Sequence, residues 1–217
     1  MQLRPHQEQA IQAMIDNDKG QVIVPTGGGK TICMIQDAKR EFESEACSTI
    51  VVVAPRILLA NQLSAEFLEH IVGVDVMHVH SGETHHFSTT NVDKIREFNY
   101  LSAKTNCNQL IFTTYHSLHK IVESNIVVDT IYFDEAHNSV QKNFFPAVEH
   151  ISTSIFTRAY FFTATPKHSL TPSKAGMNWT KVYGNVICNV PAPKLVKQGY
   201  ILPPKVEVYK TRILEKD

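Results

Sequence analysis

The chain has 217 residues, with 21 basic and 21 acidic side chains, so its formal net charge at pH 7 is zero. This length is sufficient for one large domain with its own core. The charge balance is not typical of a protein that binds nucleic acid mainly through a basic surface, so any such contacts are expected to be local or to lie on chain not present here. No apolar run approaches the roughly 20 residues that span a bilayer, so we expect no membrane partner.

Cysteine usage and the N-terminal residues indicate the cellular compartment of the protein. The chain contains no Cys-x-x-Cys pair, and its four cysteines lie far apart in the sequence, at Cys33, Cys47, Cys107 and Cys188. This spacing favours reduced cysteines with no disulfide partner. The first residues lack the apolar core of a signal peptide, so an intracellular protein, cytoplasmic or nuclear, is expected.

The first predicted elements are a helix at 3–16, with Pro5 in its first turn, and a short β-branched strand at 22–24. Three consecutive glycines end the strand, and Lys30 and Thr31 then open a helix at 32–42. Glycines allow backbone N–H groups to approach an anion, and a helix N-terminus adds positive charge. The arrangement predicts a phosphate site in which Lys30 reaches the β/γ-phosphates and Thr31 holds Mg²⁺.

The later elements alternate between apolar strands and helices. Strands are predicted at 49–54, 74–79, 109–113, 127–133 and 159–163, and helices at 57–70, 92–101, 117–123 and 144–150. Beyond them, the segment 183–190 and a short helix at 192–198 lead to Pro203 and Pro204. Strands that are apolar throughout and alternate with helices predict an α/β fold, with a mainly parallel sheet covered by helices on both faces.

Four histidines, at positions 78, 80, 85 and 86, cluster in a polar stretch after the third predicted strand. They invite a zinc interpretation, but no carboxylate or cysteine stands at ligand spacing beside them. We therefore expect solvated loop histidines here rather than a metal centre.

Asp134 and Glu135 follow directly on a predicted buried strand. In open parallel sheets, ligands bind at the carboxyl ends of the strands, which is also the edge that carries the glycine loop. A carboxylate at this edge can hold Mg²⁺, and a second one can deprotonate the water that attacks the γ-phosphate. The pattern predicts Asp134 as the metal ligand and Glu135 as the base.

These motifs together resemble the first motor domain of superfamily 2 helicases and translocases that carry a DEAH sequence. Residues 25–31 (PTGGGKT) match motif I, which tolerates Val24, and residues 134–137 (DEAH) match motif II. Residues 163–166 (TATP) match motif III, 54–56 (APR) look like motif Ia, and 114–116 (TYH) resemble a further strand-end motif. The LRPxQ sequence at 3–7 is similar to the upstream motif that reads adenine.

The resemblance implies a RecA-like P-loop NTPase fold that uses ATP and Mg²⁺, with roles that can be assigned by position. Nucleotide binding would involve Arg4, Gln7, Thr26, Gly27, Gly28, Gly29, Lys30 and Thr31, with Lys30 and Glu135 catalytic and Thr31 and Asp134 at the metal. Coupling to nucleic acid would use His137, Thr163 and Thr165, and the nucleic-acid groove would include Pro55, Arg56, Gly82 and Tyr115. Without the other motifs, Gln7 would be interpreted as a helix-surface glutamine, and Thr163 and Thr165 as a strand-end turn.

The family places a second RecA-like domain after the first, and this domain supplies an arginine to the transferring phosphoryl group. The chain contains no Gln-x-x-Gly-Arg-x-x-Arg sequence. We therefore expect residues 1–202 to form the first motor domain and residues 203–217 a linker toward a second one. Such arginines are worth roughly 10³–10⁵ in rate, so the isolated chain is expected to be a weak ATPase without unwinding activity.

The favoured function is an ATP-dependent nucleic-acid motor, with DNA slightly favoured over RNA as the track. One alternative is an ATP-gated clamp that binds nucleic acid without unwinding it, and another is the motor subunit of an ATP-dependent restriction enzyme. A small-molecule kinase or unrelated P-loop enzyme is a third alternative, but it leaves residues 134–137 and 163–166 unexplained.

Overall fold

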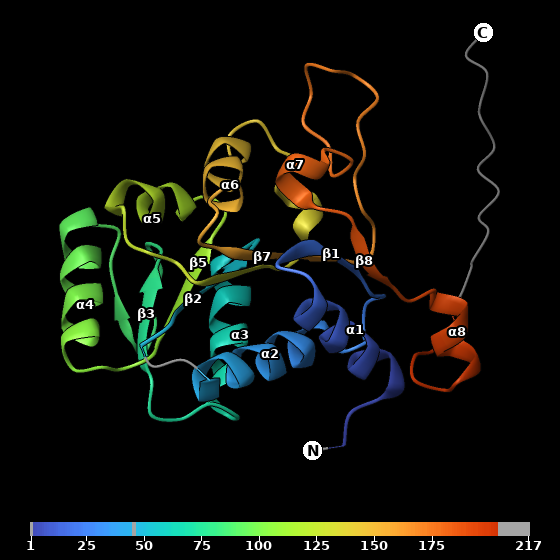
Figure 1. Ribbon diagram of the computed structural model, residues 1–217, viewed down its shortest axis with the longest axis horizontal. Coiled ribbons are helices and arrows are strands. Elements are labelled where there is room, and N and C mark those ends of the chain that lie inside the picture. The colour runs from blue at the N-terminus through green and yellow to red at the C-terminus, as the bar shows by residue number, and fades with distance from the viewer. Residues whose placement is uncertain (1, 45–46, 204–217) are drawn as a thin grey trace, which may run out of the picture.

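Residues 2–44 and 47–203 are described by a computed structural model, which contains one eight-stranded sheet (Figure 1). The strands are β1 (Lys19–Ile23), β2 (Thr49–Ala54), β3 (Asp75–Val79), β4 (Phe87–Ser88), β5 (Gln109–Thr114), β6 (Thr130–Phe133), β7 (Arg158–Thr163) and β8 (Val186–Asn189). Their order is β4-β3-β5-β2-β6-β7-β1-β8, and every pairing is parallel. The predicted parallel α/β fold is therefore confirmed.

Helices cover both faces of the sheet (Figure 1). They are α1 (Pro5–Asp16), α2 (Lys30–Ser44), α3 (Ile57–Leu68), α4 (Val92–Lys104), α5 (Leu118–Ser124), α6 (Phe145–Ser152), α7 (Thr180–Tyr183) and α8 (Ala192–Lys197), with a 3₁₀ turn, η1, at Ala136–Asn138. Helices α1, α2, α3 and α8 pack on one face, and α4, α5, α6 and α7 on the other.

Alternation along the central strand β2 divides the core into these two layers. Ile50, Val52 and Ala54 face the layer that contains α1 and α2, whereas Val51 and Val53 face the layer of α5 and α6. All of these side chains are fully buried. A strand covered on both faces has no solvated side, which explains its continuous apolar sequence.

The differences from the predicted elements lie mostly at their ends. Strand β6 begins at Thr130 rather than at 127, because Val127 is 65% exposed and lies outside the buried part of the sheet. The segment 183–190 is divided, since the short helix α7 ends at Tyr183 and β8 runs only from Val186. The two-residue strand β4 was not predicted, because it is too short to show a hydrophobic pattern.

The predicted boundary at 202 stays a prediction, and residues 204–217 of the predicted linker lie outside the described residues. Within the described part of the chain, no helix is both long and apolar enough to cross a membrane.

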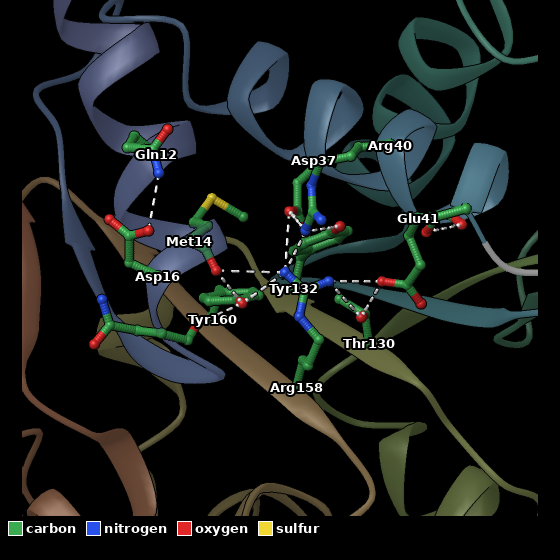
Figure 2. A network of polar contacts seen from close by, with 12 residues as sticks. Gln12, Met14, Asp16, Asp37, Arg40, Glu41, Thr130, Tyr132, Arg158 and Tyr160 are labelled. Atoms are coloured by element: carbon green, nitrogen blue, oxygen red, sulfur yellow. Dashed lines mark hydrogen bonds and ion pairs between the residues drawn. The ribbon is translucent and has the colours of Figure 1, made fainter.

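A buried polar network ties α2 to β6 and β7 at the amino ends of these strands (Figure 2). Arg158 Nη1 donates to Glu41 Oε2 at 2.7 Å, and its Nη2 donates to Asp37 Oδ1 at 3.0 Å. The Tyr132 hydroxyl donates to Asp37 Oδ2 at 2.7 Å, and Tyr160 receives a bond from Arg158 Nη2 at the same distance. Asp37 is fully buried, so its charge depends on these partners.

We predict that Arg158→Ala lowers the free energy of unfolding by about 3–5 kcal/mol, because it leaves Asp37 and Glu41 buried without their shared cation. Chemical denaturation followed by circular dichroism measures this loss. Arg40→Ala is the matched control, because Arg40 also pairs with Asp37, at 3.0 Å, but is 41% exposed. The control should cost about 1 kcal/mol or less, and equal losses in the two variants would contradict this account of the network.

Candidate functional site

The phosphate loop, residues 25–29, connects β1 to α2 at the carboxyl edge of the sheet. Gly27 and Gly29 have φ of +77° and +84°, a conformation that residues with a Cβ rarely adopt. A side chain at position 29 would also collide with the Gln7 amide. The glycines are thus required both by the turn and by the close approach of the N-terminal motif.

Lys30 and Glu135 meet at this edge, although 105 residues separate them in the sequence. Lys30 Nζ lies 3.0 Å from Glu135 Oε1, and the Lys30 side chain is only 9% exposed. Asp134 precedes Glu135 in the sequence. Its backbone N–H donates to Val53 O at 2.9 Å, so the pairing of β2 with β6 continues one residue beyond the end of β6. The structure therefore brings together the predicted loop lysine and both predicted carboxylates.

Glu135 adopts a left-handed backbone conformation, with φ of +45° and ψ of +52°. This conformation is uncommon for a residue with a Cβ, and such residues cluster at functional sites. The turn is held by Asn138, whose side-chain amide donates to Glu135 O at 2.9 Å. The sharp turn directs Glu135 toward Lys30 immediately after the strand ends.

The electrostatic environment of Asp134 is unusual for an aspartate near a lysine. Burial, followed by the negative charge of Glu135, raises the pKa of Asp134 to about 6, while Lys30 acts in the opposite direction. A dication bound at Asp134 would favour its charged form. The carboxylate of Asp134 and the hydroxyl of Thr31 are also the oxygen ligands that Mg²⁺ prefers, so both predicted ligands suit this metal chemically.

His137 connects the acid pair to the strand that carries the predicted coupling threonines. Its Nδ1 lies 3.0 Å from Thr163 Oγ1 and 3.5 Å from Glu135 Oε2. Thr163 is fully buried, and its hydroxyl also accepts a bond from Thr165 N at 3.1 Å. The predicted coupling residues are therefore in contact, and their function in coupling stays a prediction.

The N-terminal motif lies against the phosphate loop. Gln7 is 5% exposed, and its Oε1 accepts a bond from Arg4 N at 2.9 Å, so the alternative interpretation as a helix-surface glutamine is wrong. His6 Nε2 donates to Gly28 O at 2.7 Å. His6 is not among the predicted site residues, because a histidine at the start of a helix gives no signal of a contact 22 residues away.

Two of the predicted groove residues line hollows beside the acid pair. Pro55 and Arg56 border a hollow of about 460 Å³ together with Glu135 and His137. A neighbouring hollow of about 620 Å³ shares Pro55, Arg56 and His116 with the first. The arrangement gives an open path from the acid pair along the strand ends.

Tyr115 does not line this groove, and the prediction for this residue is wrong. The side chain is 1% exposed, its hydroxyl donates to Asp134 O at 2.8 Å, and its N–H donates to Ala54 O at 3.2 Å. Both donors are therefore used inside the protein. The exposed neighbour His116 faces the two hollows instead, and Tyr115 supports the turn that carries the acid pair.

Gly82 borders a third hollow, of about 930 Å³, which includes the histidines at 78, 80, 85 and 86. The expectation of solvated histidines is wrong for His78 and His80, which are both buried. Gly82 N donates to His80 Nδ1 at 3.2 Å, so His80 Nε2 must donate to His78 Nδ1 at 3.0 Å. Burial lowers the pKa of His78 to about 4, with smaller effects from His80 and the stacked His86.

This chain of bonds continues from His78 Nε2 to Ser64 Oγ, 3.1 Å away on α3. Uncharged histidines therefore fasten the loop after β3 to a helix. Among the described residues, no group of three or more His, Cys, Asp or Glu side chains has the arrangement of a metal site.

Comparison with protein families places the chain. The family described as "Type III restriction enzyme, res subunit" matches residues 1–168. The chain belongs to this family. Membership, with the parallel sheet and the motifs described above, identifies a RecA-like motor domain of the superfamily 2 type. No curated protein matches the chain.

Solved structures support the fold. The nuclease-deletion mutant of the Type ISP restriction-modification enzyme LlaGI, in complex with a DNA substrate mimic, has a TM-score of 0.73 at 21% identity over 92% of this chain. The UvsW helicase from bacteriophage T4 gives 0.56 at 13% identity over 86%. The Hef helicase domain of Pyrococcus furiosus gives 0.58 at 19% identity over 84%.

The chain spans only part of these proteins, corresponding to 21% of the LlaGI chain, 60% of the UvsW chain and 37% of the Hef chain. In each of these neighbours, the matched region is thus one portion of a longer chain.

We predict that Glu135→Gln lowers the pKa of Asp134, because the substitution removes the negative charge beside it. Lys30→Met should raise the same pKa, because it removes the compensating cation. Carboxyl-carbon NMR of the metal-free protein over pH 3–8 measures both shifts. An Asp134 pKa that does not respond to either substitution would contradict the assigned electrostatics.

Proposed function

We propose that the chain binds and hydrolyses ATP and serves as the first motor domain of a DNA-dependent translocase. The observation that carries this proposal is the contact of Lys30 with Glu135, next to Asp134, at the end of the glycine loop. In a res-subunit family domain, this arrangement has the parts needed for phosphoryl transfer to water.

The Lys30–Glu135 pair suggests how nucleotide binding prepares catalysis. The γ-phosphate carries more negative charge than one carboxylate, so Lys30 Nζ would exchange Glu135 Oε1 for phosphate oxygens. Glu135 would then be released beside the γ-phosphate, where it can accept a proton from the attacking water. The backbone turn at residue 135 keeps the carboxylate at this edge while the lysine changes partner.

Mg²⁺ would be held by Thr31 and Asp134 and would neutralise phosphate charge when bound. Asp134 has to lose its proton to serve as a ligand, and its raised pKa is still low enough for ionisation at pH 7. Lys30 assists, because its cation favours the charged carboxylate.

Nucleic acid would pass along the hollows that begin at Glu135 and His137. Arg56 is exposed at this surface and can contact phosphate. Because the net charge is zero, phosphate contacts by this chain would be local rather than spread over a broad basic surface. DNA is favoured as the track because the Type ISP enzymes LlaGI and LlaBIII, which share the fold, were determined with a DNA substrate mimic and with DNA. The same likeness favours a restriction-enzyme motor as the more specific assignment.

A second RecA-like domain of the same protein would complete the site by supplying the missing arginine. The chain alone is therefore expected to hydrolyse ATP slowly and not to displace strands. A clamp that binds DNA without moving on it remains the competing outcome for the protein that contains both domains.

We predict that Glu135→Gln in the two-domain protein lowers the DNA-stimulated kcat for ATP at least 100-fold, because the base is lost, while ATP still binds. Steady-state phosphate release with matched single- and double-stranded DNA and RNA measures the rate and identifies the track. Glu97→Gln, an exposed glutamate on α4, is the control and should leave kcat unchanged.

ATP turnover that survives Glu135→Gln would overturn the catalytic assignment. Stimulation by RNA alone would overturn the DNA assignment. DNA binding that depends on ATP, without strand displacement or translocation, would replace the motor by the clamp.

A further inference from the structure

Helix α8 and the residues that follow it lie beside the phosphate loop. The Leu195 side chain lies 3.3 Å from where a Cβ on Gly28 would stand, and the Ile201 side chain lies 3.5 Å from the corresponding point on Gly27. Tyr200 N donates to Leu195 O at 2.9 Å, and Gly199, with φ of +73°, makes the turn between them. The segment 195–201 therefore forms one wall beside the loop.

Tyr200 projects from this wall to the N-terminal motif. The Arg4 guanidinium carbon lies 4.8 Å from the centroid of the Tyr200 ring, and the His6 ring lies 5.6 Å from it at a 52° tilt. Tyr200 is half-buried, whereas His6 is 2% exposed. Two ends of the sequence thus meet in a cluster of three planar side chains next to the phosphate loop.

This cluster contains one unpaired polar atom. His6 Nε2 donates to Gly28 O, so in a neutral ring Nδ1 is an acceptor, and it has no hydrogen-bond partner among the described residues. A buried acceptor without a partner costs free energy that a ligand donor can recover. The exocyclic amine of a purine is a donor of this kind.

We propose that Tyr200 is the aromatic wall of the base subsite and that the nucleotide's purine stacks on its ring. The inference rests on the proposed function, since it concerns the base of the nucleotide whose phosphates the loop would hold. The Arg4 guanidinium lies too close to the Tyr200 ring for a base to fit between them. The purine therefore replaces the guanidinium on the face of the ring, and Arg4 contacts the base from another side.

The alternative is that Tyr200 only supports the phosphate loop, as Leu195 and Ile201 do through apolar contacts. The two functions differ in the part of the ligand that they affect. A stacking residue contributes to the binding of the base, whereas a loop support affects phosphate binding with or without a base.

The test compares Mg·ATP with Mg·tripolyphosphate, which lacks the base and sugar, by isothermal titration calorimetry on the purified chain. Tyr200→Ala should weaken ATP binding at least about fivefold, which corresponds to the lower limit for base–aromatic stacking, and leave tripolyphosphate binding unchanged. Tyr200→Phe keeps the ring and should restore ATP binding to within about twofold of the unsubstituted chain.

Ile201→Ala is the matched control, because the side chain of this neighbouring residue lies beside Gly27 of the phosphate loop. It should change the affinities for ATP and tripolyphosphate by the same factor. Equal losses for both ligands in Tyr200→Ala, or no loss for either, would overturn the base subsite. An unsubstituted chain that binds neither ligand would instead overturn the proposed nucleotide-binding function.

Discussion

The ion pair between Lys30 and Glu135 depends on the position of one helix relative to one strand. Lys30 is the first residue of α2, and Glu135 follows the end of β6. Further along α2, Asp37 is bound by Tyr132 of β6 and by Arg158 of β7. The same helix is thus attached to the end of β6 through its first residue and to β6 again through Asp37 at its middle. A shift of α2 along the sheet would break the buried network and separate the lysine from the acid pair together.

The charges at the site would favour the proposed nucleotide with a metal over either ion alone. Asp134 and Glu135 place two carboxylates side by side. Burial, together with the negative charge of Glu135, raises the pKa of Asp134 to about 6. Phosphate by itself would add negative charge to this edge, and a dication by itself would compete with Lys30. The two together would bring charge of both signs, so Lys30 would pair with the phosphates and the carboxylates with the metal.

The sequence was sufficient for the features that depend on local pattern. Strand β2 was predicted with both of its ends, because five consecutive apolar residues after Thr49 are readable without knowledge of their neighbours. The meeting of Lys30 with Glu135 followed from parallel topology, which places all strand ends at one edge. The burial of Tyr115 and of His78 did not follow, because it is decided by residues of other elements that pack above them. The left-handed backbone conformation of Glu135 likewise could not be predicted from the DEAH sequence.

Tyr200 is the clearest case of a feature beyond sequence reasoning, since its contact Arg4 stands at the opposite end of the chain. Its position matters because α8 and residues 199–201 are attached to the sheet through β8, the neighbour of the strand that delivers the phosphate loop. A base on Tyr200 and phosphates on the loop would therefore join two adjacent strands through one ligand. Binding energy that favours one arrangement of segment 195–201 stabilises that arrangement by the same amount, because the coupling is reciprocal. A nucleotide bound in this way would therefore stabilise the observed position of the wall beside the phosphate loop.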